Sequence, residues 1–217
     1  ALLRAGWEKD AVDGRTDQRV VSTPLTWVLH GAALALLPWM HTRFSVLAAT
    51  LGGLILVRLA HVPKAVAKAI AFLLPPAVSA VAWLFFFVIV YGAPDPSAPY
   101  GGRVDNSFAF LPNRLGGLLF DQGFGLVATA PVLAFGFAGF VRTRRIALEW
   151  LVMAFPYALA VTTFAMWWAG QSGPARFLVP LMLPLAIPAA CAWTAASRGW
   201  RSVMVGALVV TVWLSAV

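Results

Sequence analysis

The sequence contains few charged residues and a single cysteine. Of its 217 residues, 11% are charged and 61% are hydrophobic, and the mean hydropathy is +0.83. Soluble proteins carry about 25% charged and roughly 45–50% apolar residues, so this composition excludes a soluble globular domain. It also excludes a disordered chain, which would be poor in apolar residues. Cys191 is the only cysteine and lies in an apolar run, which excludes a disulfide scaffold.

Motifs of the common soluble chemistries are also missing. The sequence has no glycine-rich phosphate loop, nucleophile elbow or zinc-protease motif. The formal charge of +8 is not organised as a basic run with interleaved aromatic residues, so nucleic acid is not an expected partner. His30 and His41 have no Cys, Asp or Glu at ligand spacing. We therefore expect no metal site from these residues and no other cofactor, and leave the question of a divalent metal open.

Long apolar runs dominate what is present. Strands are disfavoured because open sheets cannot span lipid and period-two alternation is absent. The pattern predicts an all-α, polytopic transmembrane bundle of about seven helices, forming a single transmembrane domain over residues 1–217. The predicted helices cover residues 24–40, 44–60, 65–91, 123–141, 146–168, 176–196 and 203–217.

The ends of the sequence suggest a piece of a longer protein. The chain begins at Ala1 without a methionine, and it ends at Val217 inside an apolar run. At about 1.5 Å per residue this last run is too short for a hydrocarbon core of about 30 Å. We therefore expect the last helix to be truncated.

The basic residues predict the orientation. Lys and Arg collect on cytoplasmic loops of membrane proteins. Alternate segments hold twelve of the 16 basic residues, and these segments are predicted to be cytoplasmic: Arg4, Lys9, Arg15, Arg19, Arg58, Lys64, Lys68, Arg142, Arg144, Arg145, Arg198 and Arg201. The other side then carries one long external loop, residues 92–122.

This external loop has two parts. Its beginning, GAPDPSAPYGGR, is rich in Pro and Gly and predicts turns, with Asp95 and Asp105 as turn residues. Residues 106–120 are apolar but too short to span a bilayer, so they predict a short helix lying in the membrane interface. The alternative is a surface loop anchored by apolar side chains. Connections longer than about 12–15 residues are usually functional or disordered, and this one is too apolar for disorder.

Four arginines lie on the external side, against the general bias: Arg43, Arg103, Arg114 and Arg176. Their guanidinium groups can reach headgroups by snorkelling or pair with nearby aspartates. The functional alternative is a cluster that binds an anionic group, most plausibly a phosphate, because the guanidinium fork matches phosphate oxygens in two-point contact.

Other candidate site residues lie near these arginines. Asp121 lies between the interfacial segment and the next predicted helix. It is either an N-terminal helix residue, favoured there by the helix dipole, or a functional carboxylate that accepts a proton or binds a sugar hydroxyl. Trp167 and Trp168 are placed either to lie in the aromatic belt at the membrane interface or to stack against a sugar ring or a prenyl chain. Gln171, with Ser172 beside it, offers hydrogen bonds to hydroxyls.

Four strings together resemble the later helices of the GT-C glycosyltransferases, the superfamily of protein mannosyltransferases and aminoarabinose transferases: LPWMHTRF, YGAPDPSAPYGG, GGLLFDQGFGLVATAPVL and MWWAGQSGPARFLVPLMLP. The resemblance covers roughly residues 35–195 and implies a multi-pass enzyme of the bacterial inner membrane. Such an enzyme takes a sugar from a polyprenyl-phosphate donor and passes it, with inversion, to an acceptor at the outer face. The key aspartate of the superfamily usually lies in an early external loop, and no equivalent is visible in this sequence.

The resemblance implies roles for the external residues. A carboxylate would remove the proton of the acceptor hydroxyl, and the external arginines would stabilise the departing phosphate. Membrane lipids, the lipid-linked sugar and an acceptor of unknown identity are the implied partners. Two other classes stay open, namely a transporter or flippase segment and a non-catalytic structural subunit. Against the transporter, the charges lie at the ends of the predicted spans rather than at mid-bilayer.

Overall fold

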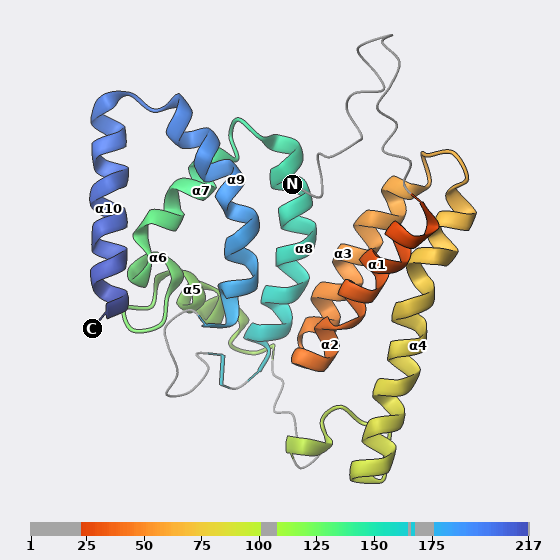
Figure 1. Cartoon of the computed structure of the whole chain (residues 1–217). Coiled ribbons are helices and arrows are strands. Elements are labelled where there is room, and N and C mark those ends of the chain that lie inside the picture. Colours follow the sequence, from red (N-terminus) through yellow and green to blue (C-terminus); the bar gives the residue numbers. More distant parts are fainter. Residues whose placement is uncertain (1–22, 101–107, 165, 168–175, 217) are drawn as a thin grey trace.

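The computed structural model describes residues 23–100, 108–164, 166–167 and 176–216. Within these ranges the elements are all helical and no β-strand occurs, which confirms the all-α class. Successive long segments run in alternating directions, so that their ends gather at two opposite ends of the molecule (Figure 1). The helices are α1 (Pro24–Ala35), α2 (Leu37–Met40), α3 (Phe44–Leu59), α4 (Ala65–Tyr91), η2 (Ala98–Tyr100), α5 (Leu111–Phe120), α6 (Leu126–Thr129), η3 (Pro131–Leu133), α7 (Ala134–Gly139), α8 (Arg144–Thr162), η4 (Arg176–Leu178), α9 (Val179–Ala195) and α10 (Arg198–Ala216).

Two of the described helices, α4 and α8, are long and apolar enough to cross a membrane. A third candidate arises if the helical residues Arg176–Met182 and Pro184–Ala195, bent by 61° from one another, count as one span. The expectation of about seven transmembrane helices is therefore not confirmed. What the described residues support is an all-helical chain with two or three candidate spans.

Proline and glycine shorten several of the expected spans. The run 24–40 divides into α1 and α2, with Pro38 in the first turn of α2. The run 123–141 divides into α6, η3 and α7, because Ala130 leaves the helical region (φ −137°, ψ 67°) just before Pro131. A proline ring disfavours the α region for the residue before it, so this run forms short pieces instead of one helix. The last run, in contrast, belongs to a longer helix, α10.

Helices α1 and α4 pack closely at a glycine. Pro76 has no N–H, so the carbonyl of Phe72 lacks its usual donor within α4. The backbone of Gly31 on α1 lies against this carbonyl, and a Cβ at Gly31 would overlap the Phe72 oxygen and lie 3.2 Å from Cδ of Pro75. The absence of a side chain at residue 31 is what allows this approach.

The rest of the α4 surface carries large apolar side chains. Of the 18 consecutive residues of α4 that are most apolar, only 6% are buried inside the protein. Val81 and Ile89 are 70% and 68% exposed, and several neighbours along the helix are similarly exposed: Val66, Ile70, Leu74, Val78 and Phe85. Continuous apolar surface of this kind is rare on soluble monomers. It is the surface expected of a helix that faces lipid.

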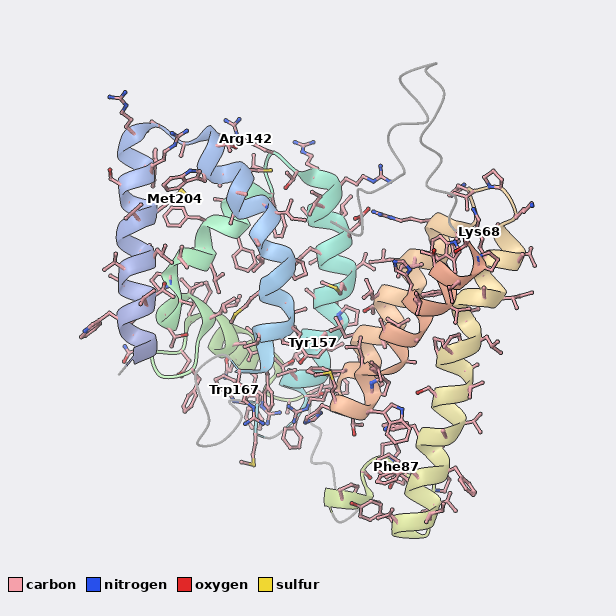
Figure 2. The ribbon with its side chains drawn as sticks, viewed as in Figure 1. Lys68, Phe87, Arg142, Tyr157, Trp167 and Met204 are labelled. Carbon is pink, nitrogen blue, oxygen red and sulfur yellow. The ribbon has the colours of Figure 1, made fainter. Side chains whose placement is uncertain are left out.

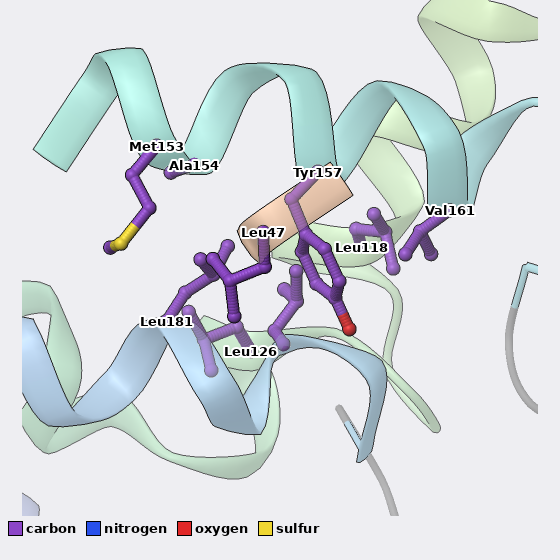
Figure 3. Close-up of a cluster of buried hydrophobic side chains, with 9 residues drawn as sticks. Leu47, Leu118, Leu126, Met153, Ala154, Tyr157, Val161 and Leu181 are labelled. Carbon is purple, nitrogen blue, oxygen red and sulfur yellow. The ribbon is translucent and has the colours of Figure 1, made fainter. Parts of the chain in front are cut away.

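The main hydrophobic core lies between α8 and its neighbours (Figure 3). Tyr157 and Val161 of α8 are almost fully buried, and Leu47 of α3 approaches them from one side. Leu118 of α5 and Leu181 of α9 complete the contact from other elements. This core joins the short helix α5 to α3, α8 and α9 at one end of the bundle.

A small ion-pair cluster joins α3 to α8 nearer the opposite end. Arg58 pairs with Glu149, and their side chains are only 15% and 17% exposed. Arg145 lies 3.4 Å from the same carboxylate and is mostly exposed. Lys68 and Arg142 also lie toward this end, whereas Trp167 lies toward the other (Figure 2). The predicted cytoplasmic residues Arg58, Lys68, Arg142 and Arg145 thus share one end.

Candidate anion-binding site

The candidate site is built where three chain segments meet, at the start of α3, the end of α8 and the start of α9. The loop before α3 is closed by hydrogen bonds from the N–H of Phe44 to the carbonyl of His41 (2.8 Å) and from Oγ of Ser45 to the carbonyl of Thr42 (2.6 Å). Arg43 is the residue immediately before α3. This turn places its side chain beside the ends of α8 and α9.

The guanidinium of Arg43 lies over two aromatic rings. Its Cζ is 4.4 Å from the centroid of Phe164, which follows α8, and 4.0 Å from the centroid of Phe177, in η4. Attraction between a cation and the negative face of a ring is worth about 0.5–2 kcal/mol. Arg43 is half-buried, so its charge is less screened by water than that of an exposed side chain.

Arg176 lies next to the same ring. Its Cζ is 5.9 Å from the centroid of Phe177, so the guanidinium carbons of Arg43 and Arg176 are at most about 10 Å apart, close to the Debye length of about 8–10 Å. Arg176 is exposed, whereas Arg43 is half-buried. Two of the four predicted external arginines are therefore close neighbours, from segments more than a hundred residues apart in the sequence.

Arg114 lies at the same end but is engaged in packing. Its Nη1 donates to the carbonyls of Thr162, Thr163 and Phe164 at 3.1, 3.2 and 3.5 Å. These carbonyls lie at the end of α8 and just beyond it, where the helix dipole favours a positive charge. Arg114 thus caps α8 and attaches α5 to its end. The sequence had suggested snorkelling, pairing with an aspartate or phosphate binding for this residue, and not capping.

His41 lies near the positive charges of Arg43 and Arg176. Its Nδ1 accepts a hydrogen bond from the backbone N–H of Arg43 at 3.2 Å. Burial lowers the pKa of His41 below its usual 6.5, and the positive charges of Arg43 and Arg176 lower it further. The ring is therefore neutral at neutral pH, and the positive charge of the site comes from the arginines.

Asp121 forms a turn at the end of α5. Its Oδ1 accepts hydrogen bonds from the N–H groups of Gly123 and Phe124, both at 2.9 Å. The expectation that Asp121 begins a helix is wrong, because it follows α5 as its C-cap residue. Its role as a functional carboxylate stays a prediction. No hydrogen bond or ion pair joins Asp121 to Arg176 in the described part of the chain, and its Oδ2 accepts none there.

The predicted turn role of Asp95 is confirmed. Its Oδ1 and Oδ2 accept hydrogen bonds from the N–H and the hydroxyl of Ser97 at 2.8 and 2.7 Å. Both hydrogen bonds lower the pKa of the Asp95 carboxyl below its usual value, and the one from the backbone N–H has the larger effect.

Trp167 packs against α5 rather than standing free. A Cβ at Gly117 would overlap its ring, and Cζ2 would lie 2.9 Å away. Trp167 also borders the main core. Arg103, Trp168 and Gln171 lie outside the described residues, so the structure gives no position for these three candidates.

A cavity of about 350 Å³ lies beneath α5, between α8 and α9. Its walls are almost entirely apolar, with Leu115 and Leu119 from α5, Ala154 and Ala158 from α8, and Leu181 and Met182 from α9. Leu115 directly follows Arg114, so the cavity begins next to the arginine end of the bundle. Among the described residues, no group of three or more His, Cys, Asp or Glu could hold a metal ion.

Sequence reasoning missed Phe164 and Phe177. Both lie in apolar strings whose aromatic residues look like ordinary core or interface residues, and only the fold brings them to Arg43. Comparison with known proteins adds no assignment, since no family model, curated protein or solved structure matches this chain.

Proposed function

We propose that this protein transfers a sugar from a polyprenyl-phosphate donor to an acceptor at the outer face of the bacterial inner membrane, as a multi-pass enzyme. The observation that carries the proposal is the meeting of Arg43 and Arg176 at Phe177. Two guanidinium groups this close make a strongly positive site. A phosphate bound beside them would be attracted by both charges and could accept hydrogen bonds from both groups.

The surroundings of the arginines favour a phosphate carried on a lipid. The arginines lie at an end of the bundle, next to the amphipathic helix α5 and the apolar cavity beneath it. The hydrocarbon of the donor would lie along apolar surface of this kind, with its phosphate against the guanidinium groups. A free, water-soluble phosphate ester would need no such surface.

The chemistry is a displacement at the anomeric carbon. The acceptor hydroxyl forms the new bond to this carbon while the bond to the phosphate oxygen breaks, and a carboxylate takes the hydroxyl proton. The negative charge that develops on the leaving phosphate is stabilised by Arg43 and Arg176. If Asp121 is the base, Oδ2 is the oxygen that serves, because Oδ1 is used in its turn.

A transfer assay with the full chain in lipid nanodiscs tests the proposal. Arg176→Ala should reduce sugar transfer at least about tenfold, since one charge-assisted interaction is worth about 1.5–3 kcal/mol. Arg176→Lys should recover only part of the loss, because lysine keeps the charge without the two-point fork. Arg201→Ala, at the other end of the bundle, should change transfer little.

Asp121→Asn separates the two roles of that residue. Asparagine keeps an oxygen that accepts the turn hydrogen bonds but cannot take a proton, so transfer should be lost while the melting temperature is kept. Activity that survives Asp121→Asn would assign the base to another carboxylate. No transfer by the wild type from polyprenyl-phosphate sugars, or equal activity of Arg176→Ala and Arg201→Ala, would contradict the proposed function and favour a structural subunit.

A further inference from the structure

Among the described arginines and rings of this end, Arg43 is the one arginine whose guanidinium lies over two rings. The Cζ of Arg114 lies 5.5 Å from the centroid of Phe110, and that of Arg176 lies 5.9 Å from Phe177. The corresponding distances for Arg43 are 4.0 and 4.4 Å, to rings from two different elements. Two close rings restrict the orientation of the guanidinium plane of Arg43 more than a single, more distant ring would.

The residues that carry the two rings are anchored to the fold. Phe164 follows α8, and its N–H donates to the carbonyl of Val161 at 3.2 Å. Phe177 packs against the main core and immediately precedes the buried Leu178. Below Arg43, the ring of Phe44 lies 6.2 Å from that of the buried Tyr157. The side chain of Arg43 therefore extends from one rigid segment onto two others.

We propose that Phe164 and Phe177 are positioning residues, which hold the Arg43 guanidinium in one orientation beside Arg176 and so set the affinity of the site for a lipid phosphate. This inference rests on the proposed function, because it names the source of the affinity at the same site. A guanidinium on a flexible side chain must be ordered when it binds, and the lost conformational freedom reduces the affinity. At Arg43 the two rings already supply this order before the phosphate arrives.

Fluorinated phenylalanine tests the inference without altering the packing. Each fluorine weakens the negative face of the ring while keeping its shape nearly unchanged. Mono-, di- and trifluorophenylalanine at residue 177, and separately at residue 164, should weaken the binding of polyprenyl monophosphate to the protein in zwitterionic nanodiscs in graded steps. We expect roughly a three- to tenfold loss at full substitution. The same series at Phe140, two residues before Arg142 and packed against Trp150, is the matched control and should leave the affinity unchanged.

A second readout follows Arg43 itself and needs no lipid. In samples labelled with ¹⁵N, the Nε–H group of Arg43 should exchange slowly with water in the wild type and faster in Phe177→Leu. Phe177→Tyr keeps an aromatic face and should restore both slow exchange and affinity.

The two readouts separate the two proposals. Absence of lipid-phosphate binding to the wild type, together with faster exchange in Phe177→Leu, would overturn the proposed function and leave the positioning of Arg43 supported. Binding that is unaffected by fluorination at both rings, or exchange that is unchanged in Phe177→Leu, would overturn the positioning role.

Discussion

At the scale of single residues, two glycines in neighbouring helices have opposite surroundings. Gly31 of α1 lies against the carbonyl of Phe72, which Pro76 deprives of its helical donor. Gly53 of α3 is also inside a helix, but a Cβ there would meet no atom within 4 Å. The first glycine is required by the packing of α1 on α4, whereas the second only adds flexibility to the unfolded chain.

Alanine at these two positions should therefore act in opposite directions. Gly31→Ala should lower the stability by about 1–3 kcal/mol through overpacking, because backbone atoms must move. Gly53→Ala should raise it by about 0.5–1 kcal/mol, the usual gain of alanine over glycine inside a helix. The melting temperatures of the two variants in detergent, measured against wild type, check this. A Gly31→Ala protein as stable as the wild type would contradict the close approach of α1 and α4.

The site shows which residue roles could be inferred in advance. The distribution of basic residues over alternate segments singled out Arg43, Arg114 and Arg176 as residues of the external side. The capping of α8 by Arg114 was not predictable, because its acceptors are backbone carbonyls about fifty residues further along the chain. The roles of Phe164 and Phe177 were hidden for a similar reason, since their partner is distant in sequence and aromatic residues are common throughout.

At the scale of elements, α5 is a short helix held by a few single contacts. It has ten residues, which is too short to be stable alone. Leu118 buries it in the main core, Trp167 covers Gly117, and Arg114 binds it to the end of α8. Residues 106–120 were predicted to contain a short helix, and this is confirmed. Its position along a membrane interface stays a prediction.

Removing the charge of Arg114 should loosen α5 locally. Arg114→Gln loses the charge-assisted hydrogen bonds to the carbonyls at the end of α8. A hydrogen bond that involves a charged group is worth about 1.5–3 kcal/mol. Hydrogen exchange of the amides of residues 111–120 should become about tenfold faster or more, while that of α4 is unchanged. Arg144→Gln, which removes an exposed charge at the other end of α8, is the matched control. Equal exchange in the two variants would show that Arg114 does not hold α5.

Helix boundaries were less predictable than helix content. Apolar runs located helices correctly at 44–60, 65–91 and 176–196, because hydrophobicity marks burial in protein or lipid. Where glycine and proline interrupt a run, as at Gly125 and Pro131, a hydropathy average cannot show that the backbone turns. For this reason seven long runs were expected, while α4, α8 and the bent pair ending at Ala195 are the described candidates for complete spans.

At the scale of the whole molecule, charge distinguishes the two ends. Arg43, Arg114 and Arg176 gather with α5 at one end, and the Arg58–Glu149 pair and Arg142 lie toward the other (Figure 2). Among the described residues, more of the basic side chains lie at the second end, which the bias of basic residues predicts to be cytoplasmic.

Cysteine labelling in sealed membranes checks this orientation. With Cys191 replaced by serine, Ser97→Cys should react with a membrane-impermeant maleimide from the outside, and Thr143→Cys only after the membrane is opened. The reason is that the segment directly after α4 and the loop before α8 lie at opposite ends of the bundle (Figure 1). Modification of both cysteines from the same side would refute this topology.

On this view the end of the bundle that bears Arg43 and Arg176 binds a lipid phosphate. The decisive measurement is the equilibrium binding of polyprenyl monophosphate to the protein in zwitterionic nanodiscs. The double variant Arg43→Gln/Arg176→Gln should bind at least about tenfold more weakly than wild type, because two charge-assisted contacts are lost. Arg142→Gln/Arg144→Gln removes the same charge from exposed residues at the opposite end and should bind like wild type. An equal loss of affinity in both double variants, or no loss in either, would contradict a phosphate site at the meeting point of α3, α8 and α9.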